Sequence, residues 1–312
     1  MPRLGPLARL LAGAVLISFA PVLVKLADVG PTPAGFYRML LGGLILAGLV
    51  QVRRAAWRGG RGYLLLCAVA GAWFAADLAF WHRSIHLVGP GLATILANFQ
   101  VFVLAGFGIL VLGERASPRL LVAIPTAVLG LFLMFGLEWN ALDADYRWGV
   151  AFGLLTAVSY GSYLVALRQA RRRGGATDSL ATVATLSLIS AAILAGLVGV
   201  EGETFAVPDL KNAGILLAYA VVAQVLAWVL ISSALPHLEA SRAGLVLLLQ
   251  PTLAFGWDLL LFRRPTTSVE LSGAVLALGA IYLGLTGRVE AGEAVQGTGR
   301  KVQGDSTSDS QS

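Results

Sequence analysis

The chain has 312 residues, of which 57% are hydrophobic and 13% are charged. Soluble globular domains carry about 25% charged residues, so this composition excludes an ordinary soluble domain and favours a helical membrane protein. The formal net charge is +6, but the arginines gather in a few short segments. That pattern is typical of membrane topology signals and not of a nucleic-acid-binding surface. The single cysteine, Cys67, excludes a disulfide within the chain, and we expect no metal and no cofactor.

Apolar segments of about 20 residues follow one another along the chain, and each is long enough to cross a bilayer. Short polar or Gly/Pro-rich stretches separate them, such as DVGPTP at 28–33 and RQARRRGG at 168–175. The sequence therefore predicts an all-α membrane protein with ten transmembrane helices. We expect them at about 8–27, 34–52, 62–82, 90–112, 119–137, 147–168, 179–200, 213–235, 241–262 and 269–288.

Basic residues favour alternate connections between these spans. Most of the 23 Lys and Arg residues fall on the side that holds the N-terminus, whereas the opposite connections are acidic. The positive-inside rule then predicts that both termini lie in the cytoplasm. We expect the chain to be a multi-pass protein of a bacterial inner (plasma) membrane. Residues 289–312 are rich in Gly, Ser, Gln and Asp, so we expect a disordered cytoplasmic tail.

The two halves of the chain resemble each other weakly. LISFAPVLV at 16–24 aligns with AVSYGSYLV at 157–165, and the segment 110–133 aligns with 259–282, which pairs Gly130 with Gly279. We expect a first five-helix repeat at 1–140 and a second at 141–288. Because five is odd, the second copy would cross the membrane in the opposite direction. Two inverted five-helix repeats are typical of secondary transporters, which hold their substrate near the midplane.

Three short motifs point to a known family. They are FYR at 36–38, early in the second span, LGER at 112–115, after the fourth span, and Gly130 in the fifth. With the span count, they make residues 8–288 resemble the drug/metabolite transporter superfamily, of the EamA type. The resemblance implies a ten-helix inverted-repeat exporter of amino acids and related metabolites. The second half departs from the pattern, since FRR at 262–264 stands where Gly-Glu is expected and no Arg matches Arg38.

The stretch AGAWFAADLAFWHRSI at 70–85 places an acid, Asp77, within the third span. A carboxylate in hydrocarbon is costly, so we expect a cationic partner or a hydrated cavity beside it. Helical spacing brings Trp73, Asp77 and Phe80/Trp81 to one face. Other spans carry similar aromatic and amide faces. The predicted substrate-binding residues are Trp73, Asp77, Phe80, Trp81, Asn98, Gln100, Tyr160, Tyr163, Gln224, Trp228 and Gln250.

Each of these faces has an alternative interpretation. Amides in membrane helices often bond to a neighbouring helix, and deep tryptophans can pack in the core. Charge balance or ion coupling is predicted for Lys25, Arg38, Asp77 and Asp258, although Lys25 and Arg38 could also extend to the interface.

The predicted function is export of small metabolites by alternating access through a central aromatic-lined cavity, and the substrates that we expect first are amino acids. Its predicted partners are a small-molecule substrate and the lipid bilayer, and not nucleic acid. The alternatives are other exported compounds, such as nucleosides or cationic drugs, and an intramembrane enzyme. The chain lacks G-x-x-x-x-G-K-[ST], G-x-S-x-G and H-E-x-x-H, so we expect neither ATP hydrolysis nor an enzyme. Proton-coupled and facilitated transport both stay open, as does the oligomeric state.

Overall fold

A computed structural model describes residues 5–54, 59–112, 116–136, 139, 141–174, 178–234, 237–238 and 246–287. The predicted tail at 289–312 lies outside these residues. The described elements are α1 (Pro6–Ser18), α2 (Ala20–Leu26), α3 (Pro31–Val52), α4 (Arg61–Val88), α5 (Pro90–Asn98), α6 (Gln100–Leu112), α7 (Pro118–Leu131), the π-helix η1 (Phe132–Gly136), α8 (Ala144–Arg173), α9 (Ser179–Glu201), α10 (Leu210–Tyr219), the π-helix η2 (Ala220–Leu226), α11 (Ala227–Ala234), α13 (Leu249–Leu261) and α14 (Ser268–Gly287).

Within the described chain, nine helical spans are long and apolar enough to cross a membrane. They account for every predicted span except 241–262. The described part of that span is α13 with the residues just before it, because 239–245 lie outside the described residues. The all-α membrane fold is therefore confirmed. The predicted boundary of the third span was too short, since α4 continues beyond 82 to Val88.

Local sequence explains where the helices begin. Proline occupies the first position of α1, α3, α5 and α7, where its missing N–H costs no hydrogen bond. Aspartate side chains cap other helices, and Asp143, Asp178 and Asp209 accept bonds from the backbone at the starts of α8, α9 and α10. These caps satisfy backbone N–H groups in the first turn that have no partner within their own helix.

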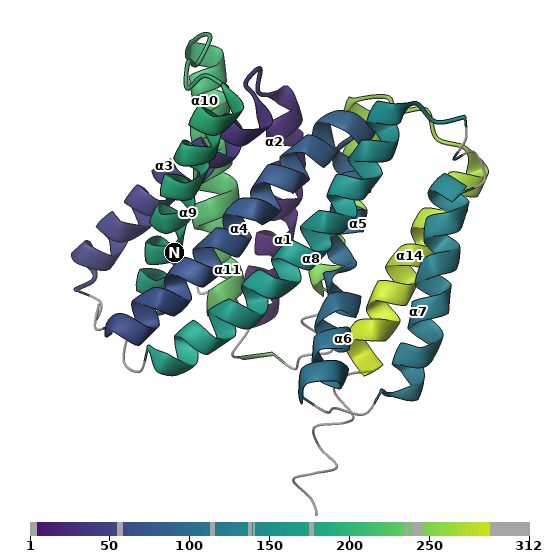
Figure 1. Cartoon of the computed structure of the whole chain (residues 1–312), viewed down its shortest axis with the longest axis horizontal. Helices are drawn as coiled ribbons and strands as arrows, with labels where there is room; N and C mark the ends of the chain where they lie inside the picture. The colour runs from purple at the N-terminus through teal and green to yellow at the C-terminus, as the bar shows by residue number, and fades with distance from the viewer. Residues whose placement is uncertain are drawn as a thin grey trace, which may run out of the picture.

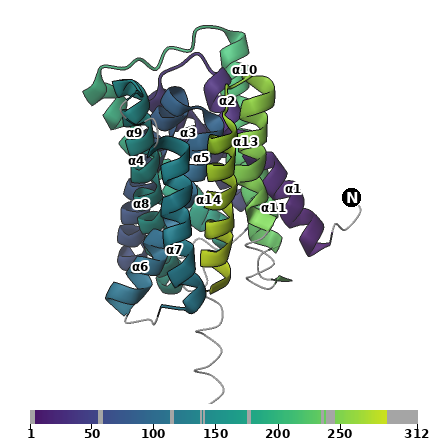
Figure 2. The same ribbon diagram turned by 90° about the vertical axis from the view of Figure 1, so that its right-hand side faces the viewer.

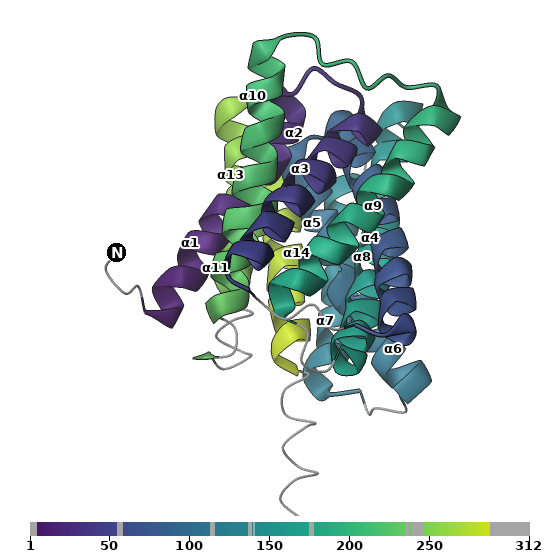
Figure 3. The same cartoon turned by 90° about the vertical axis from the view of Figure 1, so that its left-hand side faces the viewer.

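The helices pack as two related halves, and Figures 1, 2 and 3 show the bundle from three sides. α3 packs on α9, α5 on α13 and α7 on α14, so the second, fourth and fifth spans of the first half each meet their counterpart in the second. α4 packs on α8, and the corresponding pair is α1 with α11. Each contact in this set therefore has an equivalent when the two halves are exchanged, as expected for a duplicated unit. With five spans in each half, the second copy runs in the inverted direction.

A glycine permits the close approach of α7 and α14. A Cβ on Gly130 of α7 would lie 2.8 Å from the Ala277 nitrogen and 2.9 Å from the Gly273 carbonyl oxygen of α14. A side chain there would push the two backbones apart, so Gly130 sets the contact between the fifth and tenth spans.

The two ends of the bundle differ in charge. One end holds the connections after α2, α4, α9 and α13, with Asp28, Glu201, Glu203 and Asp209, and we call it the acidic face. The other end holds the connections after α3, α6 and α8, with Arg53, Arg54 and Arg171–Arg173, and we call it the basic face. In Figure 2 the acidic face is uppermost, where the long connection from α9 to α10 crosses the bundle.

Candidate functional site

Arg38, on α3, lies at the centre of a buried polar network. Its side chain is 5% exposed. Its Nε donates to Gln224 Oε1 at 3.1 Å and its Nη1 donates to Tyr219 Oη at 2.9 Å. The guanidinium carbon also lies 5.0 Å from the centre of the Tyr219 ring and 5.9 Å from that of Phe74. Directed hydrogen bonds and ring contacts thus hold a cation in place away from bulk water.

The network continues through His82 and Ser187. His82 Nδ1 lies 2.8 Å from the Pro31 carbonyl oxygen, and its Nε2 lies 2.8 Å from Tyr219 Oη. A carbonyl oxygen can only accept, so Nδ1 carries the proton and Nε2 of the neutral ring accepts from the Tyr219 hydroxyl. Gln224 Nε2 donates to Ser187 Oγ at 3.0 Å. This chain of bonds links α3, α4, α9 and η2 around Arg38.

The π-helical turn η2 explains how Tyr219 and Gln224 reach the same guanidinium. In a regular α-helix, residues five apart are rotated by about 140° relative to each other. A π-turn bonds residue i to residue i+5 and so brings such residues close to one face. η2 begins directly after Tyr219 and includes Gln224. Both side chains consequently bond to Arg38.

Asp77, on α4, is 6% exposed and lies near this network. Its carboxylate interacts electrostatically with Arg38 and with the phenol groups of Tyr160, Tyr163 and Tyr219. Within the described chain, no ion pair or hydrogen bond to the Asp77 carboxylate is found, and Arg38 Nη2 has no acceptor. Arg38 and Asp77 are therefore buried in the same region of the site without direct contact.

Aromatic rings complete the surroundings of these charges. Phe74 stacks on Tyr163 with a centroid distance of 4.5 Å and an interplanar angle of 15°. Tyr160 lies 5.5 Å from Tyr163, again between ring centroids. We use the name central site for the group Arg38, Phe74, Asp77, Tyr160, Tyr163, Tyr219 and Gln224.

A substitution at Tyr219 tests the network. Tyr219→Phe removes the hydroxyl that joins Arg38 to His82, and it leaves Arg38 Nη1 and His82 Nε2 buried without that partner. We expect a loss of about 1–3 kcal/mol in the free energy of unfolding, seen as a lower midpoint of thermal unfolding in detergent. The control is Tyr37→Phe, which removes a single bond to the Phe205 carbonyl oxygen. An equal, small shift for both variants would contradict this role.

The structure places the other predicted substrate-binding residues outside this group. Phe80 stacks on Phe152 at 6.0 Å, and Asn98 Nδ2 donates to the Thr94 carbonyl oxygen on its own helix. Trp73 is 41% exposed on the membrane-facing side of α4. Gln250 is half-buried in the first turn of α13.

Three of the predicted residues carry a buried polar atom without a hydrogen-bond partner in the described chain. The atoms are Nε1 of Trp81, Nε1 of Trp228 and Oε1 of Gln100. Trp81 lies beside the His82 ring, at 5.6 Å between centroids. Gln100 and Gln250 each follow an interruption of their span, at Phe99 and at Leu248. These atoms lie within the protein and remain available for a hydrogen bond.

The other predicted charge-balancing residues lie toward the acidic face. Lys25 Nζ donates to the His86 carbonyl oxygen at 3.1 Å. Asp258 is 1% exposed and accepts a bond from the Gly91 nitrogen at 3.0 Å, in the first turn of α5. Lys25 is therefore held at the end of α4, and Asp258 stabilises the start of a helix. Of the two cations predicted to balance Asp77, Arg38 is buried in the same region as its carboxyl group.

A second polar cluster lies at the acidic face, and the sequence did not reveal it. Arg83 Nη2 lies 2.5 Å from Glu201 Oε1, and the same nitrogen donates to Thr32 Oγ1 at 3.1 Å. Thr32 Oγ1 in turn donates to Glu201 Oε2 at 2.7 Å. The cluster joins α3 and α4 of the first half to α9 of the second. Close by, burial and the neighbouring Glu201 raise the pKa of Glu203.

The sequence reasoning also missed Tyr219, His82 and Ser187 as members of the network. Tyr219 and Gln224 are five residues apart. In a regular α-helix this spacing does not predict a shared face, so only knowledge of the π-turn would have brought the two residues together. Among the described residues, no group of three or more His, Cys, Asp or Glu side chains could hold a metal ion.

Comparisons with known proteins agree with this architecture. The EamA-like transporter family matches the chain twice, over residues 6–136 and 147–286. The "Uncharacterized inner membrane transporter YhbE" of Escherichia coli (strain K12) is 24% identical over 299 residues, covering 87% of this chain and 88% of that protein. An "Uncharacterized transporter" of Archaeoglobus fulgidus is 25% identical over 174 residues, covering 55% of this chain and 58% of that protein.

A solved crystal structure has the same fold. It superposes with a TM-score of 0.61 at 16% identity, covering 90% of this chain and 97% of the other. At this identity the likeness concerns the fold alone.

Proposed function

Because the chain belongs to the EamA-like transporter family, and so to a family of transporters and not of enzymes, we propose that it exports amino acids. The observation that carries the proposal is the pair Arg38 and Asp77, a guanidinium and a carboxyl group that are buried in the same region without forming an ion pair. An amino acid carries a carboxylate and an ammonium group on one carbon. The Arg38 guanidinium suits the carboxylate, and the Asp77 carboxylate suits the ammonium group.

The rest of the central site suits such a substrate. Arg38 uses Nε and Nη1 to hold its place, so Nη2 is the atom that would bind the substrate carboxylate. Phe74, Tyr160 and Tyr163 offer apolar ring surface to the substrate's side chain. Small-molecule sites commonly combine aromatic walls with a few convergent polar groups.

Both halves of the chain build this site, which supports alternating access. Arg38, Phe74 and Asp77 come from the first half, proposed as 1–140, whereas Tyr160, Tyr163, Tyr219 and Gln224 come from the second, proposed as 141–288. Movement of one half against the other would open the site to each side in turn. The Arg83–Thr32–Glu201 cluster also joins the two halves, so opening at the acidic face would have to break it.

Counterflow in proteoliposomes tests the proposed substrate class. Vesicles preloaded with an unlabelled compound should transiently accumulate the labelled one when both use the same carrier. We expect counterflow with amino acids and not with nucleosides or cationic drugs. If organic cations show counterflow and amino acids do not, Asp77 would bind the substrate without Arg38. That result would overturn the assignment to amino acids.

The proposed location is the inner membrane, with both termini in the cytoplasm and the basic face toward it. The asymmetry of basic residues supports this orientation, and the E. coli relative is named as an inner membrane transporter. With Cys67 replaced by alanine, a cysteine at Arg172 should be shielded from an impermeant thiol reagent in intact cells. A cysteine at Asp143 should be labelled. Labelling at Arg172 and protection at Asp143 would reverse the orientation.

A further inference from the structure

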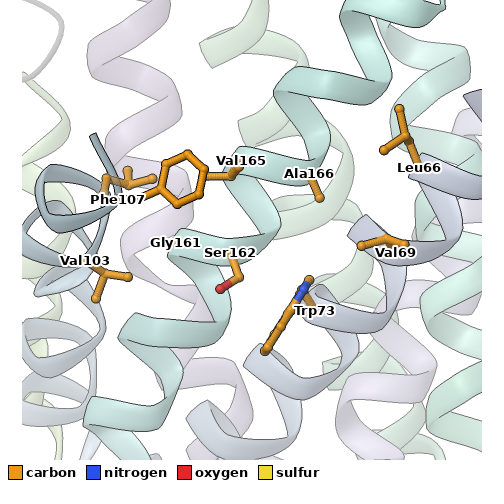
Figure 4. A pocket seen from close by; sticks show the side chains of 10 residues that line it. Leu66, Val69, Trp73, Val103, Phe107, Gly161, Ser162, Val165 and Ala166 are labelled. Atoms are coloured by element: carbon orange, nitrogen blue, oxygen red, sulfur yellow. The ribbon is translucent and has the colours of Figure 1, made fainter. Parts of the chain in front are cut away.

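An apolar pocket of about 320 Å³ lies between α4, α6 and α8, away from the central site. Val69 and Trp73 line it from α4, Val103 and Phe107 from α6, and Gly161 and Ser162 from α8 (Figure 4). The hollow forms because Gly161 and Ser162 of α8 have small side chains, whereas the neighbouring residues on α4 and α6 are large.

The pocket opens toward the membrane and not toward the bundle's interior. Trp73 and Val69 are both 41% exposed on α4. On α8, Leu155 and Val158 continue the Ser162 face and are 43% and 45% exposed. In a bilayer these exposed apolar side chains face lipid.

Two helices independently place the pocket in the half of the membrane next to the basic face. At a rise of about 1.5 Å per residue, the pocket residue Val69 lies roughly 12 Å along α4 from Arg61, and the pocket residue Val165 lies roughly 12 Å along α8 from Arg173. The hydrocarbon core is about 30 Å thick. An acyl chain that descends from the basic interface would therefore reach the pocket.

The helices that form the pocket also bring cations together at its interfacial end. Arg61 begins α4, Arg173 ends α8, and both side chains are exposed. Arg173 Nη1 lies 3.5 Å from the position that a Cβ on Gly62 would take, so its guanidinium rests beside the start of α4. Arg172 adds a third exposed cation at the same end. An apolar hollow and a positive interfacial end are thus aligned along one pair of helices.

We propose that this surface binds an anionic glycerophospholipid, with its phosphate at Arg61 and Arg173 and one acyl chain in the pocket beside Trp73. The pocket accommodates the chain of any phospholipid. The arginines distinguish a lipid with net negative charge from a zwitterionic one, because basic residues near the interface favour anionic headgroups.

Fluorescence quenching in nanodiscs tests the proposal on the full chain. The nanodiscs consist of phosphatidylcholine with a small, fixed fraction of a lipid that is brominated in its acyl chains. In one series the brominated lipid is phosphatidylglycerol, and in the other it is phosphatidylcholine. Bromine quenches nearby tryptophans, so a bound anionic lipid should quench the protein more than its zwitterionic equivalent at the same fraction. We expect Trp73→Phe to remove this excess and the control Trp148→Phe, at the acidic face, to keep it.

The arginines should set the preference. The double substitution Arg61→Gln/Arg173→Gln should weaken the apparent affinity for phosphatidylglycerol by roughly fivefold or more per arginine, while quenching by the zwitterionic lipid stays unchanged. The control Arg119→Gln, also at the basic face but on α7, should leave the preference intact. Equal quenching by both lipids in the unmodified protein would overturn the proposal, as would an excess that survives Trp73→Phe.

Discussion

Replacement of Arg38 by glutamine should reduce amino-acid transport by at least about 30-fold. Loss of one partner of a buried charge interaction costs about 2–5 kcal/mol, and Arg38 is the cation proposed to bind the substrate carboxylate. The initial rate of counterflow in proteoliposomes, at equal amounts of reconstituted protein, measures the loss. Arg38→Lys should also be impaired, because a lysine keeps the charge but cannot reproduce the two bonds to Tyr219 and Gln224.

The matched control for Arg38 is Arg147→Gln. Arg147 lies at the acidic end of α8, where Nε and Nη2 both donate to the Leu142 carbonyl oxygen. Its loss removes the same charge and similar bonds without touching the central site. We expect transport close to that of the unmodified protein. A folded Arg38→Gln protein with an unchanged rate would remove Arg38 from the substrate site.

Asp77→Asn should strongly reduce transport of amino acids and leave the fold intact. The substitution keeps the size of the side chain and removes the charge proposed to bind the substrate ammonium group. Within the described residues Asp77 has no ion pair to lose, and burial of a lone carboxylate is itself costly. The thermal unfolding midpoint should therefore stay level or rise, while counterflow falls at least about 30-fold.

Asp258→Asn provides the opposite pattern. Asp258 holds the start of α5 through its bond to the Gly91 nitrogen, so loss of its charge should lower the unfolding midpoint. The contrast between the two aspartates separates a substrate-binding role from a structural one. A large loss of stability in Asp77→Asn, restored by adding Arg38→Gln, would instead make the pair a structural charge balance.

The spans could be predicted because bilayer thickness imposes a simple rule on apolar length. Which side of a span faces lipid could not be predicted in the same way, because both the core and the lipid-facing surface of a membrane protein are apolar. Trp73 shows the difficulty. Its spacing from Asp77 predicts a shared face, yet Asp77 is buried and Trp73 is 41% exposed. Phe74, the next residue, faces Arg38 instead.

The composition of the central site was predictable in part. Arg38, Asp77, Tyr160, Tyr163 and Gln224 are polar or amphipathic residues deep in apolar spans, and the cost of burying them pointed to a shared environment. Tyr219 and His82 were missed for different reasons. The η2 turn shifts the helical register, so Tyr219 did not align with Gln224 at a spacing of three or four. His82 was assigned to the end of its span because α4 was expected to end there, whereas the helix continues to Val88.

Competition by substrate analogues tests most directly whether Arg38 and Asp77 divide the recognition of one amino acid between them. Counterflow of a labelled amino acid is measured against the unlabelled amino acid, its methyl ester and its des-amino acid, for the unmodified protein, Arg38→Gln and Asp77→Asn. We expect Arg38→Gln to remove the preference for the amino acid over its methyl ester. We expect Asp77→Asn to remove the preference for the amino acid over its des-amino analogue. If both variants keep the unmodified protein's preferences among the three compounds, Arg38 and Asp77 do not recognise the substrate's carboxylate and ammonium groups.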